Sequence, residues 1–160
     1  MKAKRKIAAL FFFCGLLSSR QTCLGNSPAS PARIVDAAIP RSIPLRIFRN
    51  YLVVAEGQFG DGMRHQNLIL DTGTAPSIID TKSARELGLA TTASTMAAMG
   101  KIIPTDIAIL PKLDLGPIQA VSLRVQVQDL SRLERDLGIP VAGIIGLDVL
   151  SKSSFRLDYE

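Results

Sequence analysis

The chain has 160 residues, enough for one domain with a moderate hydrophobic core. Its formal net charge of +5 comes from residues 1–25, which hold five of the 19 basic residues and none of the 14 acidic ones. Because the remaining chain has 14 basic and 14 acidic residues and no basic cluster, it lacks the positive surface that nucleic-acid binding requires. We therefore expect no nucleic-acid partner.

The N-terminal segment, residues 1–25, has the three-part pattern of an export signal. Four basic residues within residues 2–6 precede an apolar run at residues 7–17, and the small residues Cys23 and Gly25 suit a cleavage site. The apolar run is shorter than the ~20 residues that cross a bilayer. We expect a signal peptide at residues 1–25, no stable membrane span after its removal, and a location in the bacterial periplasm or outside the cell. An uncleaved membrane anchor is the alternative.

Both cysteines, Cys14 and Cys23, lie in this leader, so we expect no disulfide, no thiol nucleophile and no cysteine-based metal site in the mature chain. An exported protein without disulfides is less unusual in a bacterial envelope than among small secreted eukaryotic domains. His65 is the only histidine, which excludes a multi-histidine zinc site. The sequence also has no glycine-rich phosphate loop and no Gly-x-Ser-x-Gly sequence. From these absences together we expect no metal and no cofactor.

Beyond the leader, residues 26–41 are rich in proline, serine and alanine and are expected to form a flexible linker before a domain at residues 42–160. Apolar patterns predict strands at residues 43–48, 51–59, 63–70, 91–99, 102–110, 118–127, 141–145 and 155–159. Capping patterns predict short helices at residues 82–87, 130–137 and 146–150. The first three strands are expected to form an antiparallel meander, and Gly100-Lys101 is expected at the tip of a later hairpin.

Polar residues are placed to begin the three helices. Asp80 or Thr81 is expected to cap the first helix and Asp129 the second, and Asp148 is expected near the N-cap of the third. In the strand before the second helix, the odd-numbered apolar residues from Val121 onward are expected on one buried face.

One stretch combines a buried strand with a carboxylate. The apolar residues 68–70 run directly into Asp71-Thr72-Gly73-Thr74. A carboxylate at the end of a buried strand needs hydrogen-bond donors, and the two threonine hydroxyls and the Gly73 N–H can supply them. From the residues alone, a catalytic aspartate and a strand that ends in an Asx-type turn are both open.

This stretch resembles the active-site loop of the aspartic peptidases, which is Asp-Thr-Gly-Ser or Asp-Thr-Gly-Thr after an apolar strand. The sequence Ile144-Ile145-Gly146 resembles a second feature of that family, an apolar strand ending in a glycine that passes close beside the aspartate loop. The two sequences occur in the family's order, with the aspartate loop before the glycine. The resemblance covers about residues 42–160 and is closest to the retropepsin-like (retroviral-type, single-domain) peptidases, including bacterial exported members. It implies an all-β, closed single-domain barrel with short helices that acts as a homodimer.

The resemblance also implies roles for individual residues. In this family two aspartates share one proton and activate one water, and because the chain has one Asp-Thr-Gly sequence, the second aspartate would come from a second copy. Asp71 would be the catalytic residue, and Thr72, Gly73, Thr74 and Gly146 would support its loop. The Thr72 hydroxyls would brace the two loops, and Thr74 would hydrogen-bond the outer carboxylate oxygen.

The family's substrate-covering hairpin corresponds to residues 96–101, where Met99 and Gly100 are candidate substrate contacts. The implied function is that of an aspartic endopeptidase, which hydrolyses peptide bonds in a peptide or protein substrate. The alternative is a non-catalytic binding module of the cell envelope that keeps the fold and holds an extended peptide by strand addition. The intact Asp-Thr-Gly sequence favours the enzyme, whereas a hairpin with a single glycine favours the binding module.

Overall fold

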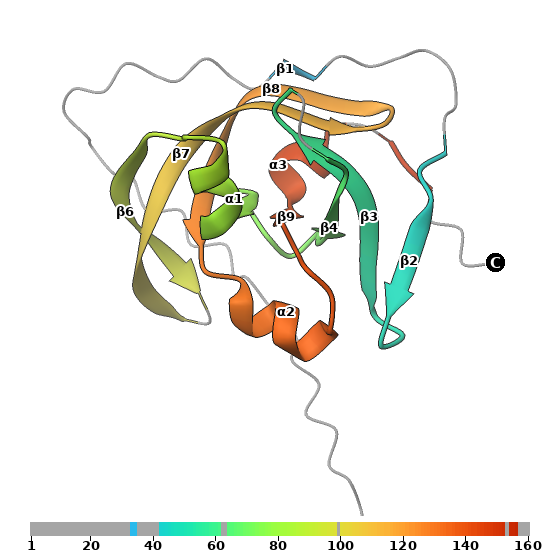
Figure 1. The fold of residues 1–160 in the computed structure, drawn as a ribbon, viewed down its shortest axis with the longest axis horizontal. Helices are drawn as coiled ribbons and strands as arrows, with labels where there is room; N and C mark the ends of the chain where they lie inside the picture. Colours follow the sequence, from blue (N-terminus) through green and yellow to red (C-terminus); the bar gives the residue numbers. More distant parts are fainter. Residues whose placement is uncertain (1–32, 35–41, 62–63, 99, 153, 157–160) are drawn as a thin grey trace, which may run out of the picture.

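The computed structural model describes residues 33–34, 42–61, 64–98, 100–152 and 154–156, which are mostly β-structure with short helices (Figure 1). The leader expected at residues 1–25 lies outside the described residues. The strands are β1 (Arg33–Ile34), β2 (Leu45–Phe48), β3 (Leu52–Phe59), β4 (Gln66–Leu70), β5 (Ile78–Asp80), β6 (Thr91–Ala98), β7 (Lys101–Leu115), β8 (Ile118–Gln128) and β9 (Gly143–Ile145). The helices are α1 (Thr81–Glu86), α2 (Ser131–Leu137) and α3 (Leu147–Leu150).

Six of the described strands close into a barrel because their pairings form a ring. The order is β8, β5, β9, β4, β3 and β7, and β7 pairs again with β8. The strands β1, β2 and β6 are added at the edges, on β8, β3 and β7 respectively. In Figure 1 the long β7 and β8 cross the top of the view, with α3 below them and α2 at the bottom. The closed, mostly β architecture expected from the sequence is confirmed.

The first part of the barrel is the predicted meander. The strands β2, β3 and β4 pair antiparallel in sequence order. Arg49 and Asn50 both have positive φ (52° and 64°), and the Tyr51 N–H donates to the Phe48 carbonyl oxygen across them (3.2 Å). Such a mirror-image turn matches the right-handed twist of the flanking strands. The last strand of the meander, β4, ends at Leu70, immediately before Asp71.

The long β7–β8 hairpin reverses its buried face midway. Ala120, which precedes Ser122 in β8, is buried, and so is Leu123, which follows it. Residues three apart on a regular strand would point to opposite faces. Ser122 has a φ of 53°, and this left-handed backbone rotates the strand by one position. The expectation that Val121 shares the buried face is therefore wrong, and Val121 is 40% exposed.

Two apolar clusters fill the described part of the protein. The larger takes buried side chains from every strand of the ring and from α3. The smaller cluster contains Leu130, and Leu133 and Leu137 of α2 pack against it. These leucines form an apolar face of α2, and the helix covers one side of the barrel through it.

Several element boundaries differ from the predictions. The strand β7 runs to Leu115 instead of ending at residue 110. Its first residue, Lys101, pairs with Ala98, so Lys101 belongs to the strand and the expectation that it lies at the hairpin tip is wrong. The strand β5 is three residues long, too short for an apolar pattern to separate it from the preceding loop.

The two ends of the described chain also differ. The strand β1 lies within the predicted linker and pairs with β8. The expected last strand, residues 155–159, is wrong in its described part, since Phe155 and Arg156 lie outside any strand, and residues 157–159 are outside the described residues. Within the described ranges, no helix is both long enough and apolar enough to cross a membrane.

Candidate active site

The Asp71 carboxylate is held by its own loop. Asp71 follows the end of β4 and is half-buried. The Gly73 N–H donates to its Oδ1 (2.8 Å), and the Thr74 hydroxyl donates to its Oδ2 (2.6 Å). Because each oxygen accepts a charge-assisted hydrogen bond, the carboxylate has a fixed direction. The structure thus brings together three residues of the candidate site.

Thr72 lies between Asp71 and Gly73 in the chain and makes no hydrogen bond to the carboxylate. It is exposed, and no hydrogen bond joins its side chain to the described residues. Gly73 and Ala75 are exposed as well, so the outer side of the loop is uncharged apart from Asp71. The brace expected between two Thr72 hydroxyls requires a second copy and stays a prediction.

The strand β9 passes through the loop between β4 and β5. It pairs parallel with β4 and antiparallel with β5. A Cβ on Gly146, just past β9, would lie 2.9 Å from the carbonyl carbon of Thr74 and closer still to its oxygen, so only glycine fits. The Asp71 N–H donates to the Ile145 carbonyl oxygen (3.0 Å), and the Leu147 N–H donates to the Thr74 carbonyl oxygen (2.8 Å). The chain on both sides of Gly146 therefore supports the Asp71 loop.

Asp148 does not cap α3, contrary to the prediction. The N-cap residue is Gly146, and no side chain caps it. Asp148 lies inside the first turn, where its carboxylate accepts the Ser77 N–H at both oxygens (3.0 Å each) and the Ser77 hydroxyl at Oδ1 (2.7 Å). No sequence pattern points directly to this contact, because 71 positions separate the two residues. The available signal was Ser77 itself, a polar residue directly before a buried apolar pair.

The β6–β7 hairpin carries the candidate substrate contacts. Gly100 stands at its tip with a φ of 74° and is exposed, whereas Met99 lies outside the described residues. Ile102, the first apolar residue past the tip, is 78% exposed. In the described part of the chain, no hydrogen bond joins this hairpin to the Asp71 loop. A substrate contact by the hairpin therefore stays a prediction.

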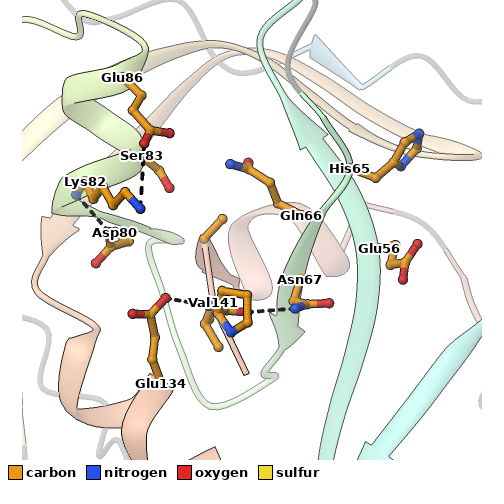
Figure 2. Close-up of a pocket in the computed structure, with 12 residues that line it drawn as sticks. Glu56, His65, Gln66, Asn67, Asp80, Lys82, Ser83, Glu86, Glu134 and Val141 are labelled. Atoms are coloured by element: carbon orange, nitrogen blue, oxygen red, sulfur yellow. Dashed lines mark hydrogen bonds and ion pairs between the residues drawn. The ribbon is translucent and has the colours of Figure 1, made fainter. Parts of the chain in front are cut away.

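A separate pocket of about 240 Å³ lies at the start of β4, the end opposite Asp71 (Figure 2). It contains none of the candidate site residues, and two of its acidic side chains accept main-chain hydrogen bonds that join parts of the fold. Asp80 accepts the N–H groups of Lys82 and Leu130 (2.8 and 3.0 Å). Glu134 accepts the Val141 N–H (2.8 Å). Across the described residues, no three or more His, Cys, Asp or Glu side chains are arranged to hold a metal ion.

Fold and loop together define a domain of the aspartic-protease type. The family model described as aspartyl protease matches residues 55–149, more than half of the chain, and the chain therefore belongs to the aspartyl protease family. A crystal structure of a retropepsin-like aspartic protease from Rickettsia conorii is similar, with a TM-score of 0.51, 17% sequence identity, and coverage of 79% of this chain and 87% of that chain. The fold is thus retropepsin-like, as expected from the sequence. Comparison with curated proteins gave no match.

Proposed function

We propose that the protein is an aspartic endopeptidase that acts as a homodimer, in which Asp71 of each copy contributes to one catalytic pair. The observation that carries this proposal is the Asp71 carboxylate, which Gly73 and Thr74 hold in the loop that β9 passes through. The chain contains one Asp-Thr-Gly sequence and the mechanism needs two carboxylates, so a second copy supplies the other. Membership of the aspartyl protease family supports peptidase activity.

In the proposed reaction the two carboxylates share one proton, because neighbouring like charges resist double ionisation. The ionised Asp71 takes a proton from a water bound between the pair, and the water oxygen attacks the scissile carbonyl carbon. The partner's Asp71, which is protonated, donates to the carbonyl oxygen. The tetrahedral intermediate then collapses and the C–N bond breaks. The amine nitrogen takes the proton that Asp71 removed from the water, and a hydroxyl of the intermediate returns its proton to the partner's Asp71 as the new carboxyl group forms. The hydrogen bonds from Gly73 and Thr74 keep the Asp71 oxygens directed while charge moves.

The surface beside the catalytic loop supports pairing with a second copy. Thr72, Gly73 and Ala75 are exposed and uncharged. Leu147, whose N–H donates to the Thr74 carbonyl oxygen, is 42% exposed although its side chain is large and apolar. Because the centres of protein interfaces are depleted of charge, this surface suits contact between two identical loops.

The proposed substrate is a peptide or an extended protein segment, held between the paired loops and the β6–β7 hairpins. Met99 and Gly100 are the proposed contacts from the hairpin. The proposed place of action is the bacterial periplasm or the outside of the cell, after removal of residues 1–25. The basic start of the chain and the short apolar run that follows support this location.

Cleavage of a peptide library by the purified protein tests the proposal, over a range of about pH 3 to 8. Asp71→Asn is the decisive variant, because its amide neither takes nor gives the proton and the dimer loses both catalytic groups at once. We expect cleavage by the wild type and none by the variant, with similar thermal melts that show both to be folded. Equal cleavage by the two proteins would contradict the role of Asp71. If the wild type binds extended peptides without cleaving them, the non-catalytic binding module replaces the enzyme.

A further inference from the structure

The loop of residues 71–77 is attached to the end of β9 and the start of α3 at every third residue. At its start, the Asp71 N–H donates to the Ile145 carbonyl oxygen (3.0 Å). In its middle, the Thr74 carbonyl oxygen accepts the Leu147 N–H (2.8 Å). Both attachments join main chain to main chain, so most side chains at these positions would allow them. The attachment at the end of the loop differs, because side chains make it.

The end of the loop is fixed by Ser77 and Asp148. Ser77 is 1% exposed, and its N–H and hydroxyl both donate to the Asp148 carboxylate, at 3.0 and 2.7 Å. The same hydroxyl accepts the Gly146 N–H (2.9 Å). The Ser77 hydroxyl is thus a donor and an acceptor at once. It links the Gly146 N–H to the Asp148 carboxylate through two consecutive hydrogen bonds. These two bonds hold Gly146, the residue whose backbone lies against Thr74.

We propose that Ser77 and Asp148 are positioning residues for the catalytic aspartate, an inference that rests on the proposed function. They hold the Gly146 backbone against the Thr74 carbonyl group, and the Thr74 hydroxyl in turn donates to Asp71 Oδ2. Among the described residues, no hydrogen bond or ion pair joins Asp148 to Asp71 directly, so the pair acts through the loop. A displacement of about 1 Å at a catalytic group lowers turnover roughly 100-fold. Side chains that fix the loop therefore affect turnover more than substrate binding.

A merely structural role for Ser77 and Asp148 is the competing explanation, because the loss of any buried hydrogen bond destabilises a fold. Asp114 provides a matched control. It is half-buried like Asp148, and it accepts a main-chain N–H from Gly116 (3.0 Å) and a side-chain N–H from Gln119 (2.9 Å). These contacts belong to the β7–β8 turn and not to the catalytic loop. Asp114→Ala therefore removes the same kinds of bond without touching the loop.

The first measurement is kcat and KM for a cleaved peptide, below the melting temperature of each purified variant. We expect Ser77→Ala and Asp148→Ala to lower kcat about 10- to 100-fold, with KM within about twofold of the wild type. The double variant should be no worse than the more affected single variant, because the pair acts as one unit. Asp148→Asn should recover part of kcat, since its amide oxygen still accepts a bond from Ser77. Asp114→Ala should keep the wild-type kcat.

The second measurement is amide hydrogen exchange, which needs no activity. Loss of the pair should speed exchange about 10-fold or more at Gly73, Thr74 and Leu147, whose N–H groups donate within the loop and its attachment. Asp114→Ala should leave these amides unchanged. If the wild type cleaves nothing but exchange rises as expected, the positioning role holds and the proposed function fails.

Three results would overturn the positioning role. The first is wild-type kcat in folded Ser77→Ala or Asp148→Ala, and the second is an equal loss of kcat in Asp114→Ala. The third, for a wild type that cleaves nothing, is unchanged exchange at the three reporter amides. Asp148→Asn replaces Asp148→Ala in both measurements if the alanine variant does not fold.

Discussion

The backbone of Gly146 passes so close to the Thr74 carbonyl group that a Cβ at residue 146 would lie 2.9 Å from the carbonyl carbon. The Thr74 atoms in this contact belong to the main chain, so no change of side-chain rotamer can make room for a Cβ. The contact arises because β9 runs between β4 and β5 in the barrel wall. It places a residue without a side chain against the threonine whose hydroxyl holds Asp71.

Gly146→Ala should therefore disturb both stability and catalysis. The added Cβ forces the loop and the turn after β9 apart, which should cost about 1–3 kcal/mol of the free energy of unfolding. It should also move the Thr74 hydroxyl away from Asp71 and lower kcat at least about 10-fold. Urea unfolding and peptide cleavage by the folded variant measure the two effects.

Gly138→Ala is the matched control for this substitution. Gly138 follows α2 with a φ of 72°, and an added Cβ there meets no atom within 4 Å. The substitution should cost about 1–2 kcal/mol through its left-handed backbone and leave kcat unchanged. Wild-type cleavage by Gly146→Ala would show that the close approach does not matter for the site.

Sequence patterns could predict the Asp71 loop and the position of Gly146, because each belongs to a short motif of neighbouring residues. The same holds for the meander, where period-two strands flank the turn at Arg49-Asn50. The match of an aspartyl protease family model to residues 55–149 agrees with this local signal. Features formed by residues that are close in the chain can therefore be predicted from the sequence.

The remaining features depend on residues that are distant in the chain or on unusual backbone. Ser77 and Asp148 each have a sufficient local explanation, as a loop residue and as a helix cap, and only the passage of β9 through the loop brings them together. The reversal of the buried face at Ser122 requires a positive φ at a residue other than glycine, for which the sequence carries no sign.

Asp80→Ala should be among the more destabilising changes outside the Asp71 loop. Asp80 is 8% exposed and caps α1 through the Lys82 N–H, which should account for about 1 kcal/mol. Its loss also leaves the N–H of buried Leu130 without its acceptor, at about 1–3 kcal/mol. We expect a total loss of about 2–4 kcal/mol in urea unfolding, and a smaller loss for Asp80→Asn, which keeps one acceptor oxygen. A loss under about 0.5 kcal/mol would show that water replaces these bonds.

Asp129 should make the stability of the fold depend on pH. Its carboxylate accepts the Ser131 N–H at the start of α2 (2.9 Å), and this hydrogen bond holds the pKa of Asp129 below its ordinary value of 3.8. Because the folded pKa is lowered, the ionised group stabilises the fold above the ordinary value, and this contribution is lost as pH falls through the folded pKa. The melting temperatures of wild type and Asp129→Ala should therefore differ most near about pH 7 and least near about pH 2. The N-cap residue of α2 is Leu130 and not Asp129, contrary to the expectation from the sequence, so Asp129 acts through the hydrogen bond from Ser131. A difference that stays constant over this range would contradict the role of the ionised Asp129 carboxylate.

Export should remove the leader from the mature protein. N-terminal sequencing of protein from the periplasm or the medium should begin between about residues 20 and 30. Phe12→Arg places a charge within the apolar run and should leave the protein in the cytoplasm. An intact Met1 in the soluble envelope fraction would contradict the signal peptide, and a full-length chain in the membrane fraction would support the uncleaved anchor instead.

Leu147→Glu should separate the proposed dimer while leaving each chain folded. The exposed Leu147 side chain lies beside the catalytic loop, so a glutamate there would bring like charges together across the interface, close to both Asp71 residues. Wild-type protein at micromolar concentration should sediment at about twice the mass of one chain, and its cleavage rate should fall faster than linearly on dilution. The variant should sediment as single chains with an unchanged circular dichroism spectrum, and its cleavage should fall at least about 100-fold, since a chain alone has one carboxylate of the pair.

Ile109→Glu is the control for Leu147→Glu, because Ile109 is exposed to a similar degree, 44% against 42%, but lies on β7 opposite Arg124 of β8. A glutamate there faces a positive charge on its own chain, so this variant should stay dimeric and active. If Leu147→Glu also stays dimeric and active, the two copies meet elsewhere and the exposed leucine has another use. If the wild type is strictly monomeric and still cleaves peptides, one carboxylate of Asp71 suffices, and the shared pair is wrong. Super-linear loss of activity on dilution, abolished in Leu147→Glu and kept in Ile109→Glu, is the result that only a catalytic pair built from two copies produces.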